Sequence, residues 1–510
     1  MPKLHPHDLF NLIKSLSKSE KRYFKLHASR HVIGDENSYE KLFDAIEAQE
    51  VYNEKEILST QTYIAQLPQL KNRLHEMILK SLDVFHAADT VETRLKNNIH
   101  HIRILIGKRL FSQAENILSK LKVLAREQEQ FLVLIELIAL KAQLFASVNY
   151  AGRNEKDLIA LQQEEEEVLK KISNTAAYRL LTQQMFMNIR KYGQLMNPVM
   201  QERYKKIMKN PLLSSVNKAE TYRSRYYYYL LHSTYSWLLC DYQRSYDIIT
   251  MQIKMMESYP LIVEESPKQY IDILFNRIIS QLHLKKFLDF KPTLEKLRNI
   301  KLHSVQLDFF RSQQSLVYEL IFYNETGQFD YSLETLKRLE RFLHQHKKTV
   351  DDVATDNAAI FYEISSMYFA LGDYKNALKW LNKILNDNEK NRSDIYEFSR
   401  LFSLVIHYEL GNDDLLQYAI VSTKKFLYKR KRLRKMEKYF FDFIQKNYRG
   451  IDDVKLKKSL AVLRAQLLSV KEDGEETPSF GYFDFIAWID AKLKKRKYAD
   501  IIKENAKVFF

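Results

Sequence analysis

The sequence predicts an all-α solenoid of stacked antiparallel helix pairs, capped by helical segments at both ends. Glycine and proline together make up only 19 of 510 residues, well below the roughly 12% of an average protein. Strand-rich folds need turns and therefore these residues, so their scarcity favours long helices joined by short loops. Apolar residues recur at three- and four-residue spacing along most of the chain, which is the helical period. A third observation is an aromatic residue that returns at a nearly fixed interval.

Residues 1-90 are predicted to form a separate N-terminal helical domain. The run Ser17-Lys18-Ser19-Glu20 fits a capping box, in which Ser17 begins a helix and Glu20 reaches back to it. Further helices are expected from Ser38, from Asn53 and from Pro68. A helix-turn-helix would also suit this order, but the usual glycine turn is absent, so a capping domain is favoured.

Residues 91-210 are predicted to form helical hairpins that are only weakly repeat-like. The repeat pattern consists of an aromatic residue, a small residue three positions later and then apolar residues. One copy begins at Phe111, with Ala114 as the small residue. Helices are expected from Phe131 to Phe145 and from Asp157 to Ile172, without that pattern.

Residues 211-423 carry the repeat most clearly. The aromatic positions Tyr242, Phe287, Phe329 and Tyr374 are 45, 42 and 45 residues apart. A fixed period of this size is typical of stacked hairpins, each of which buries its apolar face on the next. In the copy that begins at Phe287, the large Phe290 stands where the others have a small residue.

The clearest hairpin covers residues 358–385. We expect Gly372 to end its first helix in the left-handed conformation. The small residues Ser365 and Ala377 would let the two helices approach closely. The expected apolar positions are Phe361, Ile364, Tyr368 and Leu371 on the first helix, and Tyr374, Ala377, Leu378, Leu381 and Ile384 on the second.

This hairpin resembles a tetratricopeptide repeat, with Glu389 where that family has its terminal proline. The period here exceeds the family's 34 residues, so longer helices are expected. The residues that carry the resemblance are Ser365, Tyr368, Gly372, Asp373, Tyr374, Ala377, Leu381 and Ile384.

The resemblance implies a stack that binds a protein or peptide on a concave face. In the family, that face is lined by the second, fifth, ninth and twelfth residues of each first helix. The alternative is that the longer helices bury these positions against the neighbouring repeat. The candidate partner-binding residues are Tyr227, Thr234, Trp237, Tyr362, Ser366 and Phe369.

Most of the net charge of +16 lies in two short segments. Residues 424–438 hold nine basic residues and one acid, and residues 492–497 hold five basic residues. We interpret 424-470 as a basic helical segment, in which one helix with an apolar stripe would bind phosphates or an acidic partner. A solvated helix face is the alternative, and KRKRLRK would also pass as a nuclear-import signal. The candidate anion- or nucleic-acid-binding residues are Lys425, Lys429, Arg430, Arg432, Arg434 and Lys435.

Residues 482-510 are predicted to form one C-terminal capping helix. We interpret the acidic stretch from Lys471 to Gly481 as a linker. The helix that follows is too apolar to remain solvated, so we expect it to dock back on the stack.

The sequence contains no pattern that indicates an enzyme. No two glycines lie closer than seven residues, which excludes a phosphate-binding loop and a dinucleotide fingerprint. The histidines lack metal-ligand spacing, and Cys240 is the only cysteine. We therefore expect no cofactor, metal or membrane partner, and we expect the chain to be cytoplasmic.

The predicted function is a non-enzymatic scaffold or adaptor that binds a protein or peptide. The alternative is a nucleic-acid-associated regulator that uses the basic helix 424-438 or the N-terminal domain.

Overall fold

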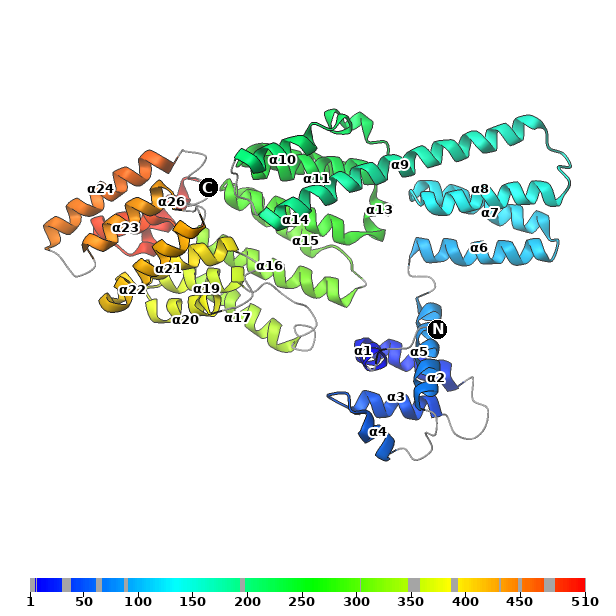
Figure 1. The fold of residues 1–510 in the computed structure, drawn as a ribbon, viewed down its shortest axis with the longest axis horizontal. Helices are drawn as coiled ribbons and strands as arrows, with labels where there is room; N and C mark the ends of the chain where they lie inside the picture. The colour runs from blue at the N-terminus through cyan, green and yellow to red at the C-terminus, as the bar shows by residue number, and fades with distance from the viewer. Residues whose placement is uncertain are drawn as a thin grey trace. The chain divides into compact units, whose positions relative to one another are not determined.

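The computed structural model is all-helical, as the composition predicts, and contains no strand among the residues that it describes. These are residues 5, 7–29, 38–60, 67–86, 90–192, 198–302, 304–346, 358–386, 393–430, 433–447, 452–471 and 482–509. The chain divides into two compact units, residues 1–173 and residues 174–510. The division falls within the long helix α9 (Glu155–Tyr192) (Figure 1).

The first unit begins with short helices that share one apolar core, which includes Phe24, Leu42, Phe43 and Ile78. The predicted capping box is confirmed: the Ser17 N–H donates to a Glu20 carboxylate oxygen at 2.6 Å, and the Glu20 N–H donates to the Ser17 hydroxyl at 3.3 Å. The helices of this part are α1 (Asp8–Ser15), α2 (Lys18–Ser29), α3 (Ser38–Ala48), α4 (Glu54–Thr60) and α5 (Leu67–Phe85).

The rest of the first unit is a set of longer helices with a core of its own. Helices α6 (Val91–Gly107), α7 (Phe111–Glu127) and α8 (Phe131–Ser147) pack in chain order, and α9 joins the same core. The predicted small residue Ala114 is fully buried between neighbouring helices.

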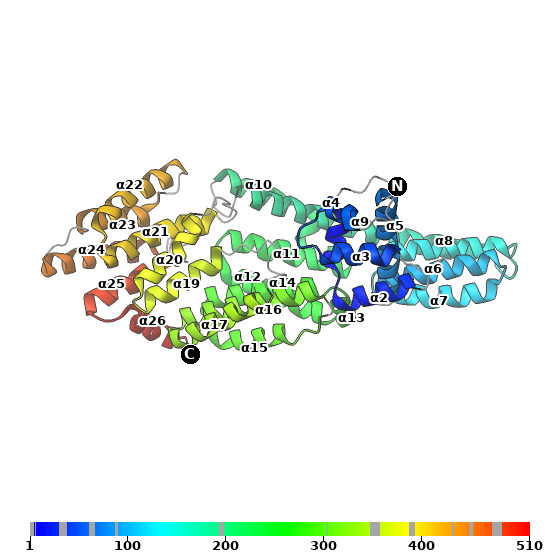
Figure 2. The same cartoon turned by 90° about the horizontal axis from the view of Figure 1, so that it is seen from below.

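The second unit consists mainly of consecutive helical hairpins (Figure 2). The second helix of each hairpin also packs on the first helix of the next, as in a helical repeat. The hairpins are α11 (Tyr222–Leu238) with α12 (Tyr242–Glu257), α14 (Pro267–His283) with α15 (Phe287–Arg298), α16 (Val305–Glu325) with α17 (Phe329–Gln345), α19 (Ala358–Ala370) with α20 (Tyr374–Leu385), and α21 (Ser393–Leu410) with α22 (Asp413–Lys429). Shorter elements are α10 (Pro198–Met208), the 3₁₀ turns η1 (Pro211–Ser214) and η2 (Val216–Lys218), and α13 (Pro260–Glu265).

The same turn closes all five hairpins. One residue in each turn has a positive φ. The backbone N–H of the residue that follows it donates to the carbonyl oxygen five positions before that donor, at 2.8–3.1 Å. This is the hydrogen bond of a Schellman cap. The left-handed residues are spaced by 45, 42, 45 and 39 positions, and they are Cys240, Lys285, Gly327, Gly372 and Gly411. The repeat that the aromatics predict is therefore present in the backbone as well.

The close approach expected at residues 358–385 is confirmed. Ser365 and Ala377 are both fully buried. The Ser365 hydroxyl donates to the Ala377 carbonyl oxygen at 2.8 Å, so the small side chains face each other across the two helices.

The expectation of one basic helix over 424–438 is wrong. Helix α22 ends at Lys429, and α23 (Lys435–Asn447) begins after Leu433 and Arg434, which are not helical. The Arg434 N–H donates to the Glu437 carboxylate at 3.0 Å, which caps the new helix. A continuous helix would have carried cations on every side. Met436, at the start of the new helix, is fully buried in the core.

The expectation of a single C-terminal helix also requires correction. Residues 482–509 contain two helices, α25 (Phe485–Lys494) and α26 (Tyr498–Lys507). Lys495 is left-handed between them, and the Arg496 N–H donates to the Ala491 carbonyl oxygen at 2.9 Å. The segment therefore reverses its direction through the same Schellman cap that closes the hairpins. Helix α24 (Asp453–Lys471) precedes it and packs on α25.

Candidate functional site

Helices α14, α16, α19 and α21, the first helices of four successive hairpins, pack side by side. We call the surface that they share the first-helix face. Residues 482–509, which we call the C-terminal segment, cover part of this face. The site is therefore built from the hairpins and from a distant part of the same chain.

The start of the C-terminal segment lies on α19 and α21. The Tyr482 ring stacks on Phe398, with centroids 4.2 Å apart, and lies 5.6 Å from Tyr362. The Phe483 ring lies 5.3 Å from Phe369. Aromatic pairs at these separations stabilise beyond the area that they bury.

Helix α26 lies against α16, α17 and α19. Tyr498 and Ile502 pack on the apolar core that these helices share. Gly327, in the turn between α16 and α17, approaches the backbone of Lys503 so closely that an added Cβ would lie 2.6 Å from the Lys503 Cα. Only glycine leaves room for this contact.

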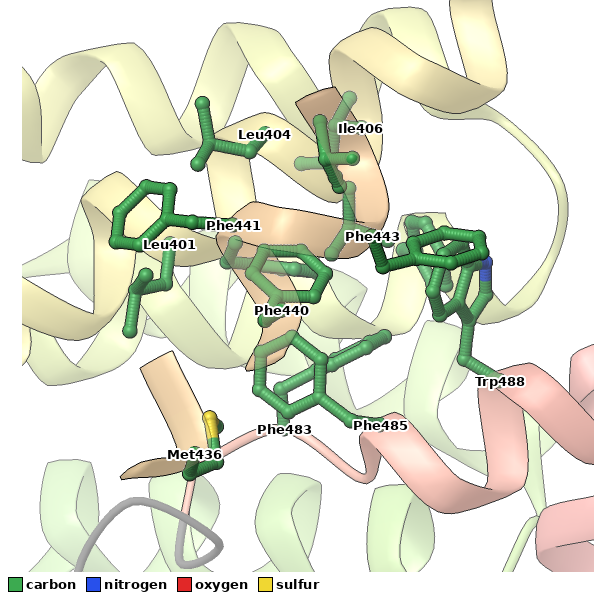
Figure 3. Packing of buried hydrophobic residues seen from close by; sticks show 14 of the residues in the cluster. Leu401, Leu404, Ile406, Met436, Phe440, Phe441, Phe443, Phe483, Phe485 and Trp488 are labelled. Atoms are coloured by element: carbon green, nitrogen blue, oxygen red, sulfur yellow. The ribbon is translucent and has the colours of Figure 1, made fainter. Parts of the chain in front are cut away.

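Helix α25 is held to α21 through a buried carboxylate. The indole N–H of Trp488 and the ammonium of Lys492 both donate to Glu409, each at 2.6 Å. Figure 3 shows Phe483 and Phe485 close to Phe440, with Trp488 beside Phe443; the Phe440 and Phe485 rings are 4.9 Å apart. Charge-assisted hydrogen bonds in an apolar setting make this junction specific.

A polar pocket of about 380 Å³ remains where the C-terminal segment does not fill the first-helix face. Three carboxylates, Glu325, Glu363 and Asp484, line it together with Lys285 and Lys471. Asn324, Ser366, Tyr482, Tyr498 and Asn505 complete much of its polar wall.

Burial disfavours the charged form of two of these carboxylates, Glu325 and Glu363. Burial raises the pKa of Glu363 to about 7, with a further contribution from Glu325. Burial likewise raises the pKa of Glu325, an effect that Lys285 partly offsets. Burial lowers the pKa of His283, which also lines the pocket, to about 4, and this keeps the imidazole neutral near pH 7.

Two residues expected on an open binding surface are instead buried. Tyr362 is 2% exposed and Phe369 is 1% exposed, because the C-terminal segment and Phe402 of the neighbouring α21 cover them. The expectation of a surface at these two positions is therefore wrong for this conformation. Ser366, on the same face of α19, is half-buried and lines the pocket.

The candidates on α11 are half-buried. Tyr227 packs edge-on against Tyr226, with centroids 5.6 Å apart. Trp237 lies 4.8 Å from Tyr242 and 5.4 Å from His283. Thr234 lies between these two positions, and its side chain is half-buried as well.

The basic candidates separate into two groups. Lys425, Lys429 and Lys435 are exposed. Arg430 is exposed as well, but it pairs with the buried carboxylate of Glu397 at 3.0 Å and lies over the Phe426 ring.

The remaining two basic candidates lie beyond Arg430. Arg434 is half-buried in the connection to α23. Arg432 lies outside the described residues. The ion pair with Glu397 gives Arg430 a structural role, which the charge pattern of the sequence does not reveal.

Sequence reasoning missed the acidic pocket. Glu325 ends α16 and Glu363 lies one turn into α19, so no local spacing joins them. Asn324 is the twelfth residue counted from Gln313, so the family pattern would have placed it on the shared surface.

Within the described residues, no helix is long and apolar enough to cross a membrane, and no group of three or more His, Cys, Asp or Glu side chains is placed to hold a metal ion. Comparisons of the chain with protein-family models, with curated proteins and with solved structures found no match.

Proposed function

We propose that this chain is a non-enzymatic scaffold or adaptor, built on a tetratricopeptide-like solenoid, that binds a protein or peptide segment on its first-helix face. The observation that carries the proposal is that a distant segment of the same chain, the C-terminal segment, lies on this face. Aromatic anchors enter it at Phe483 and Tyr498. Buried aromatic anchors are the residues that dominate the energy of most protein interfaces.

The recurring turn supports the repeat architecture of the proposal. Five hairpins share the same hydrogen-bonded turn, and the first helices of four of them pack in succession. Stacked repeats present their first helices as one extended surface. Such a surface suits a partner that lies across several helices.

The C-terminal segment, which is tethered to this surface, would also regulate binding by competing with a partner for the first-helix face. Because the C-terminal segment is covalently attached, its effective concentration at the face is on the order of millimolar. A partner that binds the same place must displace it, so the intact chain would bind more weakly than one in which the segment is released.

Affinity capture from native lysate tests this function, with and without nuclease. The comparison is between the wild-type chain and an opened variant that carries Phe483→Ala and Tyr498→Ala. We expect a protein that the opened variant retains more strongly and that a synthetic peptide of residues 482–510 displaces. Identical capture by both chains, insensitive to the peptide, would contradict the proposal.

A second candidate function, nucleic-acid binding, is favoured by one patch on α22. Tyr428 is 74% exposed between the exposed Lys425 and Lys429, which combines a stacking surface with cations. Log affinity for duplex DNA should then fall with log salt at a slope of about −0.9 per phosphate contacted.

The matched variant for this candidate replaces Lys425, Lys429 and Lys435 by glutamine. Arg430 is left in place, because its ion pair with Glu397 belongs to the fold. We expect a flatter salt slope and weaker binding across all sequences. A wild-type chain without affinity for nucleic acid at low salt would eliminate this candidate.

A further inference from the structure

We propose that the exposed face of α22 binds the same face of a second copy of this chain, with the two helices antiparallel. Helix α22 is the second helix of its hairpin and lies at the edge of the second unit (Figure 2). No residue of this face belongs to a first helix, so the inference does not depend on the proposed function.

Large apolar side chains are concentrated on the exposed face of α22. Within the residues that the structure describes, no other helix has more than two large apolar side chains that are over half exposed. Single exposed apolar residues are ordinary, whereas a continuous group marks an interaction site. The four on α22 are between 59% and 77% exposed, and they are Leu415, Tyr418, Val421 and Tyr428.

The exposed face has the spacing of a seam between two helices. Its central positions follow one another at intervals of four, three, four and three residues, which is the 3.5-residue period of a coiled coil. All of them are exposed, and they are Asp414, Tyr418, Val421, Lys425 and Tyr428. The opposite side of the helix packs into its own unit through the buried residues Leu416, Ile420, Thr423 and Leu427.

The charge of α22 reverses along the helix, and this reversal identifies the occupant. Asp413 and Asp414 are exposed at its start, Lys425 and Lys429 are exposed near its end, and residues 415–423 carry no charge. Within the described part of the chain, none of these four side chains forms an ion pair. An identical antiparallel helix brings acids opposite cations at both ends, whereas a parallel one brings like charges together.

The same seam sets the register of the pair. When Asp414 of one copy faces Lys425 of the other, Tyr418 of the first copy faces Val421 of the second. A two-fold axis repeats both contacts, as in the isologous interfaces of most homodimers. The apolar contacts therefore lie in the middle of the seam and the ion pairs lie at its ends.

The size of the interface predicts a reversible dimer. A tyrosine side chain buries roughly 150–250 Å². The four tyrosines of two copies would therefore supply a large part of the roughly 1,000 Å² that a specific interface needs. Because an interface of one helix pair is small, we expect a dissociation constant on the order of micromolar.

Sedimentation velocity of the full-length chain, over a concentration range that spans this constant on both sides, tests the dimer. We expect the mass to rise with concentration from that of the monomer towards that of the dimer. Tyr418→Gln should weaken association roughly tenfold or more, whereas Leu132→Gln, at a comparably exposed leucine of α8, should not. A wild-type chain that stays monomeric, or a dimer that Tyr418→Gln leaves unchanged, would overturn the inference. Far-ultraviolet circular dichroism reports whether each variant has folded.

Charge reversal tests the antiparallel register without relying on loss of function. Asp414→Lys places cations opposite Lys425, and Lys425→Glu places acids opposite Asp414, so each variant alone should associate roughly tenfold more weakly than the wild type. In a mixture of the two, both ends of the seam again pair opposite charges. We expect the mixture to form a heterodimer, and a mixture that associates no better than its components would overturn the inference.

Duplex DNA is the other occupant that the cations of this face would suit, and Asp414→Lys separates the two. This change weakens the dimer but adds a cation, so it would strengthen the binding of a phosphate backbone. A chain that remains monomeric, and whose affinity for a DNA duplex rises with Asp414→Lys, would overturn the dimer and assign the face to nucleic acid.

Discussion

Gly327 and Gly372 hold the same place in two hairpin turns, yet only one of them touches the C-terminal segment. Both are left-handed, with φ of +68° and +80°. A Cβ on Gly327 would lie 2.6 Å from the Lys503 backbone, whereas a Cβ on Gly372 would meet nothing within 4 Å. The pair therefore separates the strain of the turn from the docking of α26.

We predict that Gly327→Ala destabilises the chain more than Gly372→Ala. Each alanine carries about 1–2 kcal/mol of left-handed strain, and Gly327→Ala adds about 1–3 kcal/mol of overpacking against Lys503. Urea unfolding measures the difference, and limited proteolysis of α26 shows where it arises. Equal losses in the two variants would mean that α26 does not rest on this turn.

The second prediction at this scale concerns Glu363. Its pKa is raised from 4.5 to about 7 in the folded chain, so the fold favours the protonated form. The stability from this group is therefore fully present below about pH 4.5 and is lost as pH rises through 7. Burial lowers the pKa of His283 to about 4, so this group adds stability as pH rises towards its unfolded pKa of 6.5. Both chains carry His283, so its contribution cancels from the difference between them.

Glutamine resembles the protonated carboxyl group. The melting temperature of Glu363→Gln should therefore rise relative to that of the wild type between pH 5 and pH 8. A constant difference across this range would show that Glu363 titrates normally in the folded chain.

At the scale of the element, α21 offers a matched pair of buried carboxylates. Glu409 binds Trp488 and Lys492 of α25, and Glu397 binds Arg430 just after α22. Their side chains have the same 6% exposure. Because both lie on one helix, replacing each in turn compares two junctions against the same background.

Glu409→Ala should release α25. Hydrogen bonds to charged groups stabilise by about 1.5–3 kcal/mol each, and this change removes two. In a chain whose Trp237 and Trp380 are replaced by phenylalanine, we expect the emission of Trp488 to shift to longer wavelength. Glu397→Ala should destabilise the α22 end and leave that emission unchanged. A blue-shifted emission retained in Glu409→Ala would contradict the assigned junction.

The hairpins could be predicted from the sequence because their signals are local. The aromatic residue of each second helix follows the left-handed residue by two positions, so the spacing of Tyr242, Phe287, Phe329 and Tyr374 reports the turns themselves. The break between α22 and α23 was harder to predict from the sequence, because it depends on Glu437 as a cap and on Glu397 as the partner of Arg430. The second of these partners lies on another hairpin and leaves no local pattern.

At the scale of the whole molecule, the sequence predicted that the C-terminal segment docks but not where. Its apolar residues require burial, and several surfaces would satisfy that requirement. The contacts that fix the position join residues far apart in the chain, such as Tyr362 with Tyr482 and Glu409 with Lys492. The acidic pocket was missed for the same reason, because Glu325 and Glu363 come from different hairpins.

The central claim is that the first-helix face binds peptide segments and that the C-terminal segment is one of them. A labelled peptide of residues 482–510 tests it by fluorescence anisotropy against the opened variant and the wild-type chain. Glu409→Ala serves as a second opened chain, in case the double variant folds poorly.

The account predicts saturable binding to the opened chains, loss of binding when Phe483 and Tyr498 of the peptide are replaced by alanine, and affinity for the wild-type chain lower by roughly tenfold or more. Equal affinity for opened and wild-type chains, or no binding to a folded opened chain, would contradict it.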